Sequence, residues 1–295
     1  MPNVMKRLFL AEPLGFCGGV RRALEMFNRI VAEHPDCPVY VLHELVHNST
    51  VTNAMKLKNA VFVDRLGDVP SEAVTLFGAH GISPAIEREA MRRKLRYYDA
   101  VCPLVSRLQA TAEKAPEDLP LIFYGDVQHP EVQSVLGRVA SPRVFILGKL
   151  EDVFKLPPLE KALFLCQTTR NHEQVLKLSE TLRQRIPGLI DKSAVCDAVS
   201  RRQKAVAELS QKCELMLIIS SPHSSNGLRM LGIAQEKCPN AFMVNNEDDV
   251  TGAMLAGVSN VGVGAATSTP DYVIKAVIDK LKSFGFVAEN NAVLN

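Results

Sequence analysis

Short apolar runs alternate with helix-length segments along the whole chain, and this alternation constrains the fold more than any other feature of the sequence. The segments between the runs, such as residues 20–32 and 175–185, have the apolar spacing of amphipathic helices. Strands that alternate with helices predict an α/β fold with parallel, doubly wound sheets. The expected strands are residues 7–11, 39–42, 61–63, 74–77, 121–124, 144–147, 162–165, 215–219, 242–244 and 261–263.

Many of these strands run directly into a cluster of small or polar residues. The clusters are found in "LFLAEPLGFCGG", "VTLFGAHGIS", "LIFYGDVQHPEV", "LFLCQTTRN", "LIISSPHSSNG" and "VGVGAATSTPD". Parallel α/β folds place ligands at the carboxyl ends of their strands. A single open sheet cannot direct all these ends into one crevice, so we expect several small α/β units around a central cavity.

Composition excludes several classes of protein. The 295 residues carry a formal net charge of +2, which argues against a dedicated nucleic-acid binder. The longest apolar runs, such as residues 215–219, are too short to cross a membrane. The apolar start "LFLA" stops at Glu12 and Pro13, so we expect no export signal, a cytoplasmic location and reduced thiols.

The seven cysteines are widely spaced and form no CxxC pair, which argues against a disulfide scaffold or a zinc ribbon. Cys17, Cys102 and Cys196 lie near the starts of helical segments, about one in each third of the chain. The positive end of a helix favours a thiolate, which is the form that binds metals. On spacing alone, ordinary packing remains an alternative for these three. The cysteines expected to be packing or surface residues are Cys37, Cys166, Cys213 and Cys238.

Eight segments occur in the order typical of one enzyme family. They are "GFCGGVRRAL", "HELVHN", "AHGIS", "DAVCPLV", "HPEV", "QTT", "SSN" and "ATSTP". Together they extend over nearly the whole chain, from about residue 8 to residue 281. The chain therefore resembles the LytB/IspH family, the 4-hydroxy-3-methylbut-2-enyl diphosphate reductases of the non-mevalonate isoprenoid pathway.

The resemblance implies three small α/β lobes in pseudo-threefold arrangement around an iron–sulfur cluster. The implied bounds are 19–103 for the first lobe, 104–194 for the second, and 195–285 with the N-terminal strand 1–18 for the third. Residues 286–295 would form a C-terminal tail. By the same resemblance, Cys17, Cys102 and Cys196 bind a [4Fe-4S] cluster and leave one iron without a protein thiolate. The isolated Cys17 would then find its partner cysteines in the other lobes.

The implied reaction is a reductive dehydration, in which two electrons and two protons remove an allylic hydroxyl as water. The products are isopentenyl and dimethylallyl diphosphate. The implied partners are the allylic diphosphate and a ferredoxin or flavodoxin as electron donor, with no nucleic acid or membrane, for a monomer or homodimer. The residues that match the substrate pocket are His47, His80, His129, Ser224, Ser225, Asn226 and Ser268.

Glu131 and Thr168 match the family's proton-transfer residues. Glu131 follows Pro130, so we expect it in the first turn of a helix, where the helix dipole lowers the pKa of a carboxyl group. Burial raises that pKa, and we expect desolvation to dominate once the substrate is enclosed, with the proton relayed through Thr168. Without the motif, a helix-capping glutamate would be the simpler interpretation.

Several positions depart from the family's pattern, and five of them bear on the site. Leu42 replaces an arginine, Asp126 a histidine, Ser134 a glycine, Val199 a threonine, and Arg170 a leucine. The expected cluster and diphosphate residues are all retained, so the core chemistry should be retained too. The changes near the substrate leave open a paralogue that reduces a related allylic diphosphate.

Two other functions remain open. A non-catalytic iron–sulfur sensor would have no use for the proton route through Glu131 and Thr168. A zinc hydrolase assembled from scattered His and Cys is disfavoured by the lack of HExxH and CxxC.

Overall fold

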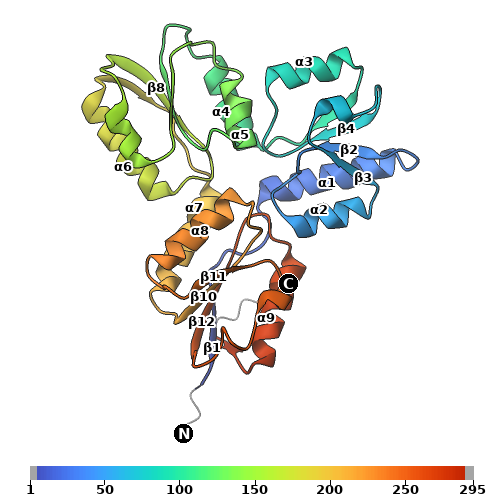
Figure 1. Cartoon of the computed structure of the whole chain (residues 1–295), viewed down its shortest axis with the longest axis vertical. Helices are drawn as coiled ribbons and strands as arrows, with labels where there is room; N and C mark the ends of the chain where they lie inside the picture. The colour runs from blue at the N-terminus through green and yellow to red at the C-terminus, as the bar shows by residue number, and fades with distance from the viewer. Residues whose placement is uncertain (1–4, 290–295) are drawn as a thin grey trace. The chain divides into compact units, whose positions relative to one another are not determined.

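The computed structural model describes residues 5–289, which form two compact units. Of the described residues, the first unit comprises 5–18, 47–51 and 197–289, and the second comprises Gly19–Val46 and Thr52–Cys196. Three parallel sheets with flanking helices account for the described strands, one in the first unit and two in the second (Figure 1). The predicted α/β class with parallel sheets is confirmed.

The sheet of the first unit is parallel throughout and has the strand order β11-β10-β12-β1-β13. Its strands are β1 (Arg7–Leu10), β10 (Leu215–Ile219), β11 (Ala241–Val244), β12 (Asn260–Ala265) and β13 (Val287–Ala288). Helix α9 (Asp271–Ser283) covers one face, and α7 (Asp197–Ser210) and α8 (Ser225–Gln235) cover the other (Figure 1). Each face therefore buries its own apolar layer, which explains why β10 is apolar along its whole length and β12 is apolar after its first residue, Asn260.

The first sheet of the second unit has the order β3-β2-β4-β5. Its strands are β2 (Val39–Leu42), β3 (Ala60–Val63), β4 (Val74–Phe77) and β5 (Arg96–Asp99). The neighbouring helices in the chain are α1 (Gly18–Glu33), α2 (Ser49–Lys56), α3 (Pro84–Arg92) and the short η1 (Leu66–Asp68). The α1 helix buries Val20, Ala23, Phe27 and Ile30, a spacing that keeps one face of the helix apolar.

The second sheet of this unit has the order β7-β6-β8-β9. Its strands are β6 (Leu121–Tyr124), β7 (Val144–Leu147), β8 (Lys161–Cys166) and β9 (Gly188–Asp191). One face packs against α6 (His172–Arg185) and η2 (Leu150–Lys155), and the other against α4 (Pro103–Glu113) and α5 (Pro130–Leu136).

The same strand order occurs in all three sheets. In the two sheets of the second unit, the strands counted in chain order lie side by side as second, first, third and fourth. The sheet of the first unit has the same order when the count begins at β10. There β1, from the start of the chain, takes the fourth place beside β12. We propose the lobes 19–103, 104–194 and 195–285 with 1–18 as the repeating units. In the expected tail, Val287–Ala288 pair with β1, and residues 290–295 lie outside the described residues.

Three strands were not expected from the sequence. The strands β5, β9 and β13 are outermost in their sheets and short, so they carry little of the apolar signal of a buried strand. The α7 helix begins at Asp197, whose side chain forms an ion pair of 3.0 Å with Arg201 across the first turn. The α3 helix ends at Arg92, since Lys94 adopts a positive φ of 57°. Within residues 5–289, no helix combines the length and apolarity needed to span a membrane.

Candidate functional site

Each of the three candidate cysteine ligands occupies the same kind of position. Each lies directly before a helix, and its backbone N–H donates to a carbonyl two residues beyond the end of a β-strand. These bonds join Cys17 to Thr267 (3.1 Å), Cys102 to Ala79 (3.0 Å) and Cys196 to Thr168 (2.9 Å). The strands concerned are β12, β4 and β8, the third in each repeat, so the same junction occurs three times. All three cysteines are partly exposed.

The loop that carries Cys17 is held in place by α7 and α9. The buried guanidinium of Arg202 donates to the carbonyl of Gly15 at 2.7 Å and to that of Leu14 at 3.4 Å. Gly15 has a φ of +76°, and a Cβ there would lie 2.0 Å from Oδ1 of Asp271. Only glycine fits this backbone without strain. The geometry of the Cys17 loop is therefore set by contacts that leave no room for a side chain at position 15.

The other cysteines have different surroundings. Burial raises the pKa of Cys166 and of Cys213 to about 12, and it also raises the pKa of Cys238. These thiols stay neutral at physiological pH, and a neutral thiol is a poor metal ligand. Cys37 lies in the turn between α1 and β2. The four residues fit the packing and surface roles expected for them.

Glu131 and Thr168 form a buried pair. Glu131 lies in the first turn of α5, as expected, and is 1% exposed. Thr168 donates its backbone N–H to Oε1 of Glu131 at 2.6 Å and its hydroxyl to Oε2 at 2.9 Å. Burial raises the pKa of Glu131 to about 7, although both bonds from Thr168 act to lower it. The protein itself supplies this burial, so both protonation states are accessible near neutral pH.

His129 and His80 lie beside this pair. His129 is the N-cap of α5, and its Nδ1 accepts the backbone N–H of Glu131 at 3.2 Å. A neutral His129 therefore carries its proton on Nε2, which can donate to a ligand. The ring centroids of His80 and His129 are 5.1 Å apart, with the rings nearly perpendicular. His80 follows β4 and is one residue from Ala79, the partner of Cys102.

The serine and asparagine residues of the first unit that are expected to bind the substrate lie in two places, at the start of α8 and in the loop after β12. Ser224 caps α8 by accepting the N–H of Gly227 at 3.1 Å. The side chain of Asn226 is buried, and neither its Oδ1 nor its Nδ2 has a hydrogen-bond partner among the described residues. Ser225 between them is half-buried. A buried amide without partners costs about 1–3 kcal/mol, which points to a ligand as the missing partner.

Ser268 lies in the loop after β12. Its hydroxyl lies 3.4 Å from the carbonyl of His47, and it follows Thr267, the partner of Cys17. In the first unit the structure thus brings His47, Ser268 and Cys17 into one connected neighbourhood. In the second unit it connects His80, His129, Glu131, Thr168 and Cys196 in the same way.

Comparison with known proteins decides the family. The family model described as LytB protein matches residues 8–282. The chain belongs to the LytB family. Among its relatives, a 4-hydroxy-3-methylbut-2-enyl diphosphate reductase of Burkholderia mallei is 36% identical over 94% of this chain and 86% of the relative. The enzyme of the same name from Methylococcus capsulatus is 35% identical over 94% of this chain and 91% of the relative.

Solved structures of LytB-type reductases match the fold as well. The E-1-hydroxy-2-methyl-but-2-enyl-4-diphosphate reductase from Plasmodium falciparum superposes with a TM-score of 0.90 at 30% identity, covering 99% of this chain and 94% of that one. A structure of (E)-4-hydroxy-3-methyl-but-2-enyl diphosphate reductase, the terminal enzyme of the non-mevalonate pathway, gives 0.66 at 26% identity. It covers 95% of this chain and 100% of that one.

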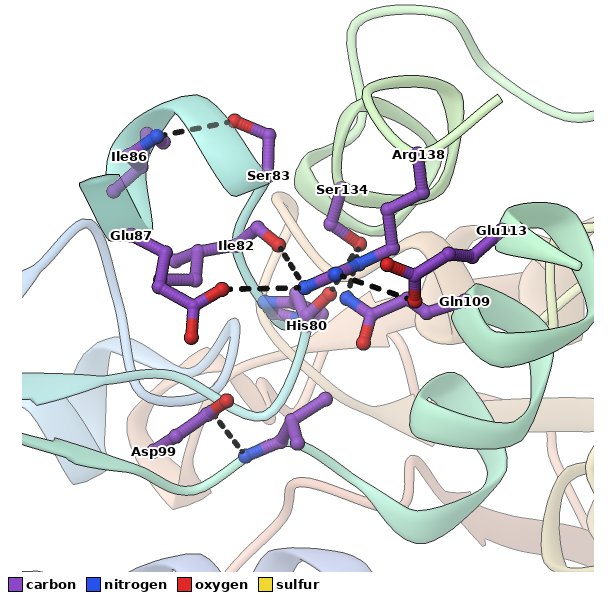
Figure 2. A network of polar contacts seen from close by, with 11 residues as sticks. His80, Ile82, Ser83, Ile86, Glu87, Asp99, Gln109, Glu113, Ser134 and Arg138 are labelled. Atoms are coloured by element: carbon purple, nitrogen blue, oxygen red, sulfur yellow. Dashed lines mark hydrogen bonds and ion pairs between the residues drawn. The ribbon is translucent and has the colours of Figure 1, made fainter. Parts of the chain in front are cut away.

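Several residues of this LytB protein support the site but were not found from the sequence. Arg202 holds the Cys17 loop, and Gln109, Ser134 and Arg138 lie against one side of the His80 loop (Figure 2). In the sequence, Ser134 differs from the family's glycine, but nothing indicates its contact with His80. No sequence motif marks Gln109, Arg138 or Arg202, because their roles depend on contacts between segments far apart in the chain.

Proposed function

We propose that this LytB protein reduces 4-hydroxy-3-methylbut-2-enyl diphosphate to isopentenyl and dimethylallyl diphosphate. Two electrons and two protons enter, the allylic C–O bond breaks, and the hydroxyl leaves as water. A ferredoxin or flavodoxin in the cytoplasm supplies the electrons. The observation that carries this proposal is the Glu131–Thr168 pair, a buried carboxyl group with a pKa of about 7 beside the loop that holds Cys196.

The donor set fits an iron–sulfur cluster. Cys17, Cys102 and Cys196 are partly exposed sulfur donors at helix starts, whereas burial keeps Cys166 and Cys213 protonated. Soft thiolates are the ligands of iron–sulfur clusters. We propose that the first three hold a [4Fe-4S] cluster with one iron free of protein ligands. When bound, such a cluster supplies electrons and a Lewis-acidic iron for the substrate hydroxyl.

Glu131 is the proposed proton source. Its carboxyl group is shielded from water and is half-protonated near neutral pH, which suits a general acid. The hydroxyl of Thr168 lies 2.9 Å from Oε2 and can pass a proton from Glu131 toward the substrate, because a hydroxyl both donates and accepts. The backbone N–H of Thr168 keeps Oε1 fixed during this transfer.

The remaining residues are proposed to bind the diphosphate. The amide of Asn226 and the capping hydroxyl of Ser224 lie at the start of α8, where the helix dipole favours an anion. Ser225, Ser268, His47, His80 and His129 complete the proposed donor set. These side chains are neutral or cationic, as a diphosphate requires.

The second candidate is a reductase for a related allylic diphosphate. Val199 is buried in α7, where the family's pattern has a threonine hydroxyl near the substrate. Arg170, also a departure, is buried with its guanidinium 4.2 Å from the centroid of the Tyr124 ring. Both changes alter the polarity of side chains close to the proposed site, so they favour a change in substrate range rather than a loss of chemistry.

The test is turnover by anaerobically purified protein under a chemical reductant. With 4-hydroxy-3-methylbut-2-enyl diphosphate, we expect consumption of the substrate and formation of both products. An allylic diphosphate analogue assayed in parallel separates the two candidates by their kcat/KM values. If protein with a full cluster consumes neither compound, both candidates are contradicted. A non-catalytic iron–sulfur sensor is then the remaining function.

A further inference from the structure

The loop that carries His80 is held by two helices of the second unit (Figure 2). This loop, residues 79–83, follows β4. The hydroxyl of Ser134, on α5, lies 3.0 Å from the carbonyl oxygen of His80. The same hydroxyl lies 2.8 Å from the carbonyl of Glu131, on its own helix, and accepts the amide N–H of Gln109, on α4, at 3.1 Å. One side chain thus connects the His80 loop, α5 and α4.

The Ser134 hydroxyl has a single proton to share between two carbonyl oxygens. It is 1% exposed, so water cannot replace either bond. The bond to Glu131 is local to α5, whereas the bond to His80 joins residues 54 positions apart in the chain. Loss of the hydroxyl would leave the carbonyl of His80 without this donor and the amide of Gln109 without this acceptor.

The neighbouring residues of the loop are held from the same side. Gly81 has a φ of +73°, and a Cβ there would lie 2.4 Å from Nε2 of Gln109. The guanidinium of Arg138 reaches the carbonyl of Ile82 at 3.3 Å and lies 4.0 Å from the carboxylate of Glu87. His80, Gly81 and Ile82 are therefore all positioned by side chains from α4, from α5 and from Arg138, two residues beyond α5.

We propose that Ser134 is a positioning residue that fixes the His80 loop against the helix carrying His129 and Glu131. This inference rests on the proposed function, because it assigns His80 to diphosphate binding. Since Ser134 and His129 belong to the same helix, the bond to the His80 carbonyl sets the distance between the two histidine rings. Glycine, the family's residue here, has no hydroxyl to make this bond. The bond between residue 134 and His80 therefore depends on the serine of this chain.

The test compares Ser134→Ala with a matched control, Ser210→Ala. Ser210 is also buried in a helix, but among the described residues its hydroxyl bonds only to the carbonyl of Val206 in the same helix. In Ser134→Ala holoprotein we expect faster hydrogen–deuterium exchange in residues 79–83. We also expect KM to rise about tenfold, the effect of one hydrogen bond, while kcat changes less than KM. Ser210→Ala should match the wild type in both measurements.

Two further variants keep the test decisive if Ser134→Ala folds poorly. Ser134→Thr retains the hydroxyl and should restore both the exchange rate and KM. Gln109→Leu removes the other side-chain partner and should change both in the same direction as Ser134→Ala. Because the two residues act on one loop, the double variant Gln109→Leu/Ser134→Ala should be little worse than Ser134→Ala alone.

The outcomes separate this inference from the proposed function. An active wild type with unchanged exchange and KM in Ser134→Ala overturns the positioning role and leaves the reductase intact. A uniform loss of stability without a change in KM also overturns it, because the serine would then be only structural. If the wild type proves inactive, protection of residues 79–83 by inorganic diphosphate decides the inference. We expect protection in the wild type and less in Ser134→Ala, whereas equal protection contradicts the role.

Discussion

Thr168 bonds both carboxylate oxygens of Glu131, with its backbone N–H on Oε1 and its hydroxyl on Oε2. Its own carbonyl accepts the N–H of Cys196. One residue thus joins the proposed proton source to a proposed cluster ligand. The arrangement holds a buried acid in a fixed orientation beside a proposed cluster ligand.

Replacement of Glu131 by glutamine should remove the proton source while retaining the shape of the site. The amide oxygen can still accept the N–H of Thr168, so we expect the cluster and substrate affinity to remain. Turnover should fall by at least about 10²-fold, the usual effect of a lost general acid. The measurement is kcat under a chemical reductant.

Glu173→Gln is the matched control, because Glu173 is an exposed glutamate in the first turn of α6. It should leave turnover unchanged. Equal turnover in Glu131→Gln and the wild type would limit Glu131 to helix capping.

The raised pKa of Glu131 also makes stability depend on pH. The folded protein holds this proton up to a pKa of about 7, whereas the unfolded chain releases it near 4.5. Between these values the folded state binds more protons, so the contribution of Glu131 to stability falls as pH rises, by up to roughly 3 kcal/mol. The free energy of unfolding of wild type minus Glu131→Gln, measured from pH 4.5 to 8, should show this decline. A difference that stays constant across this range would contradict the raised pKa.

Replacement of Asn226 by leucine should affect stability and binding in opposite directions. The buried amide makes no hydrogen bond within residues 5–289, so an apolar side chain of similar size should leave the free protein as stable or stabilise it by about 1–3 kcal/mol. Binding of inorganic diphosphate, measured by calorimetry, should weaken at least about tenfold.

Thr269→Val supplies the comparison for stability. The hydroxyl of Thr269 is buried and donates to the carbonyl of Ile219 at 2.8 Å, so its loss should destabilise the protein. Unchanged diphosphate affinity in Asn226→Leu would remove Asn226 from the binding site.

Arg202→Ala should weaken the hold on the Cys17 loop. The guanidinium bonds the carbonyl of Gly15 across 187 positions in the chain, and alanine leaves that carbonyl without this donor. We expect the variant to lose iron faster than the wild type under oxygen exposure, as followed by absorbance and iron analysis. Arg201→Ala is the control, because Arg201 is exposed and its ion pair with Asp197 is local to α7. Equal rates of iron loss in the two variants would show that Arg202 does not support Cys17.

The sequence predicted the buried strands well because burial on both faces leaves a continuous apolar run. The β10 strand, Leu215–Ile219, has the predicted bounds. The β5 strand, "RYYD", was missed because an edge strand needs few apolar residues. The polar loops after the strands were predicted as places for ligands, because parallel α/β folds bind ligands at the carboxyl ends of their strands.

Parts of the site could not be predicted because they depend on burial and on distant contacts. The position of Glu131 in a first helical turn suggested that the helix dipole lowers its pKa. Only the structure shows that burial raises this pKa more than the dipole lowers it, even without substrate. The bonds of Ser134 to His80 and of Arg202 to Gly15 connect segments that no local pattern relates. Likewise, the missing partners of the Asn226 amide are visible only once its surroundings are known.

The most direct test of the central claim is the iron and acid-labile sulfide content of anaerobically purified cysteine variants. Cys17→Ser, Cys102→Ser and Cys196→Ser should each contain much less iron and sulfide than the wild type. Cys166→Ser and Cys213→Ser should match the wild type, because desolvation raises the pKa of both thiols to about 12 and keeps them protonated. A full and stable complement of iron and sulfide in any of the first three variants would contradict the assignment of that cysteine as a cluster ligand.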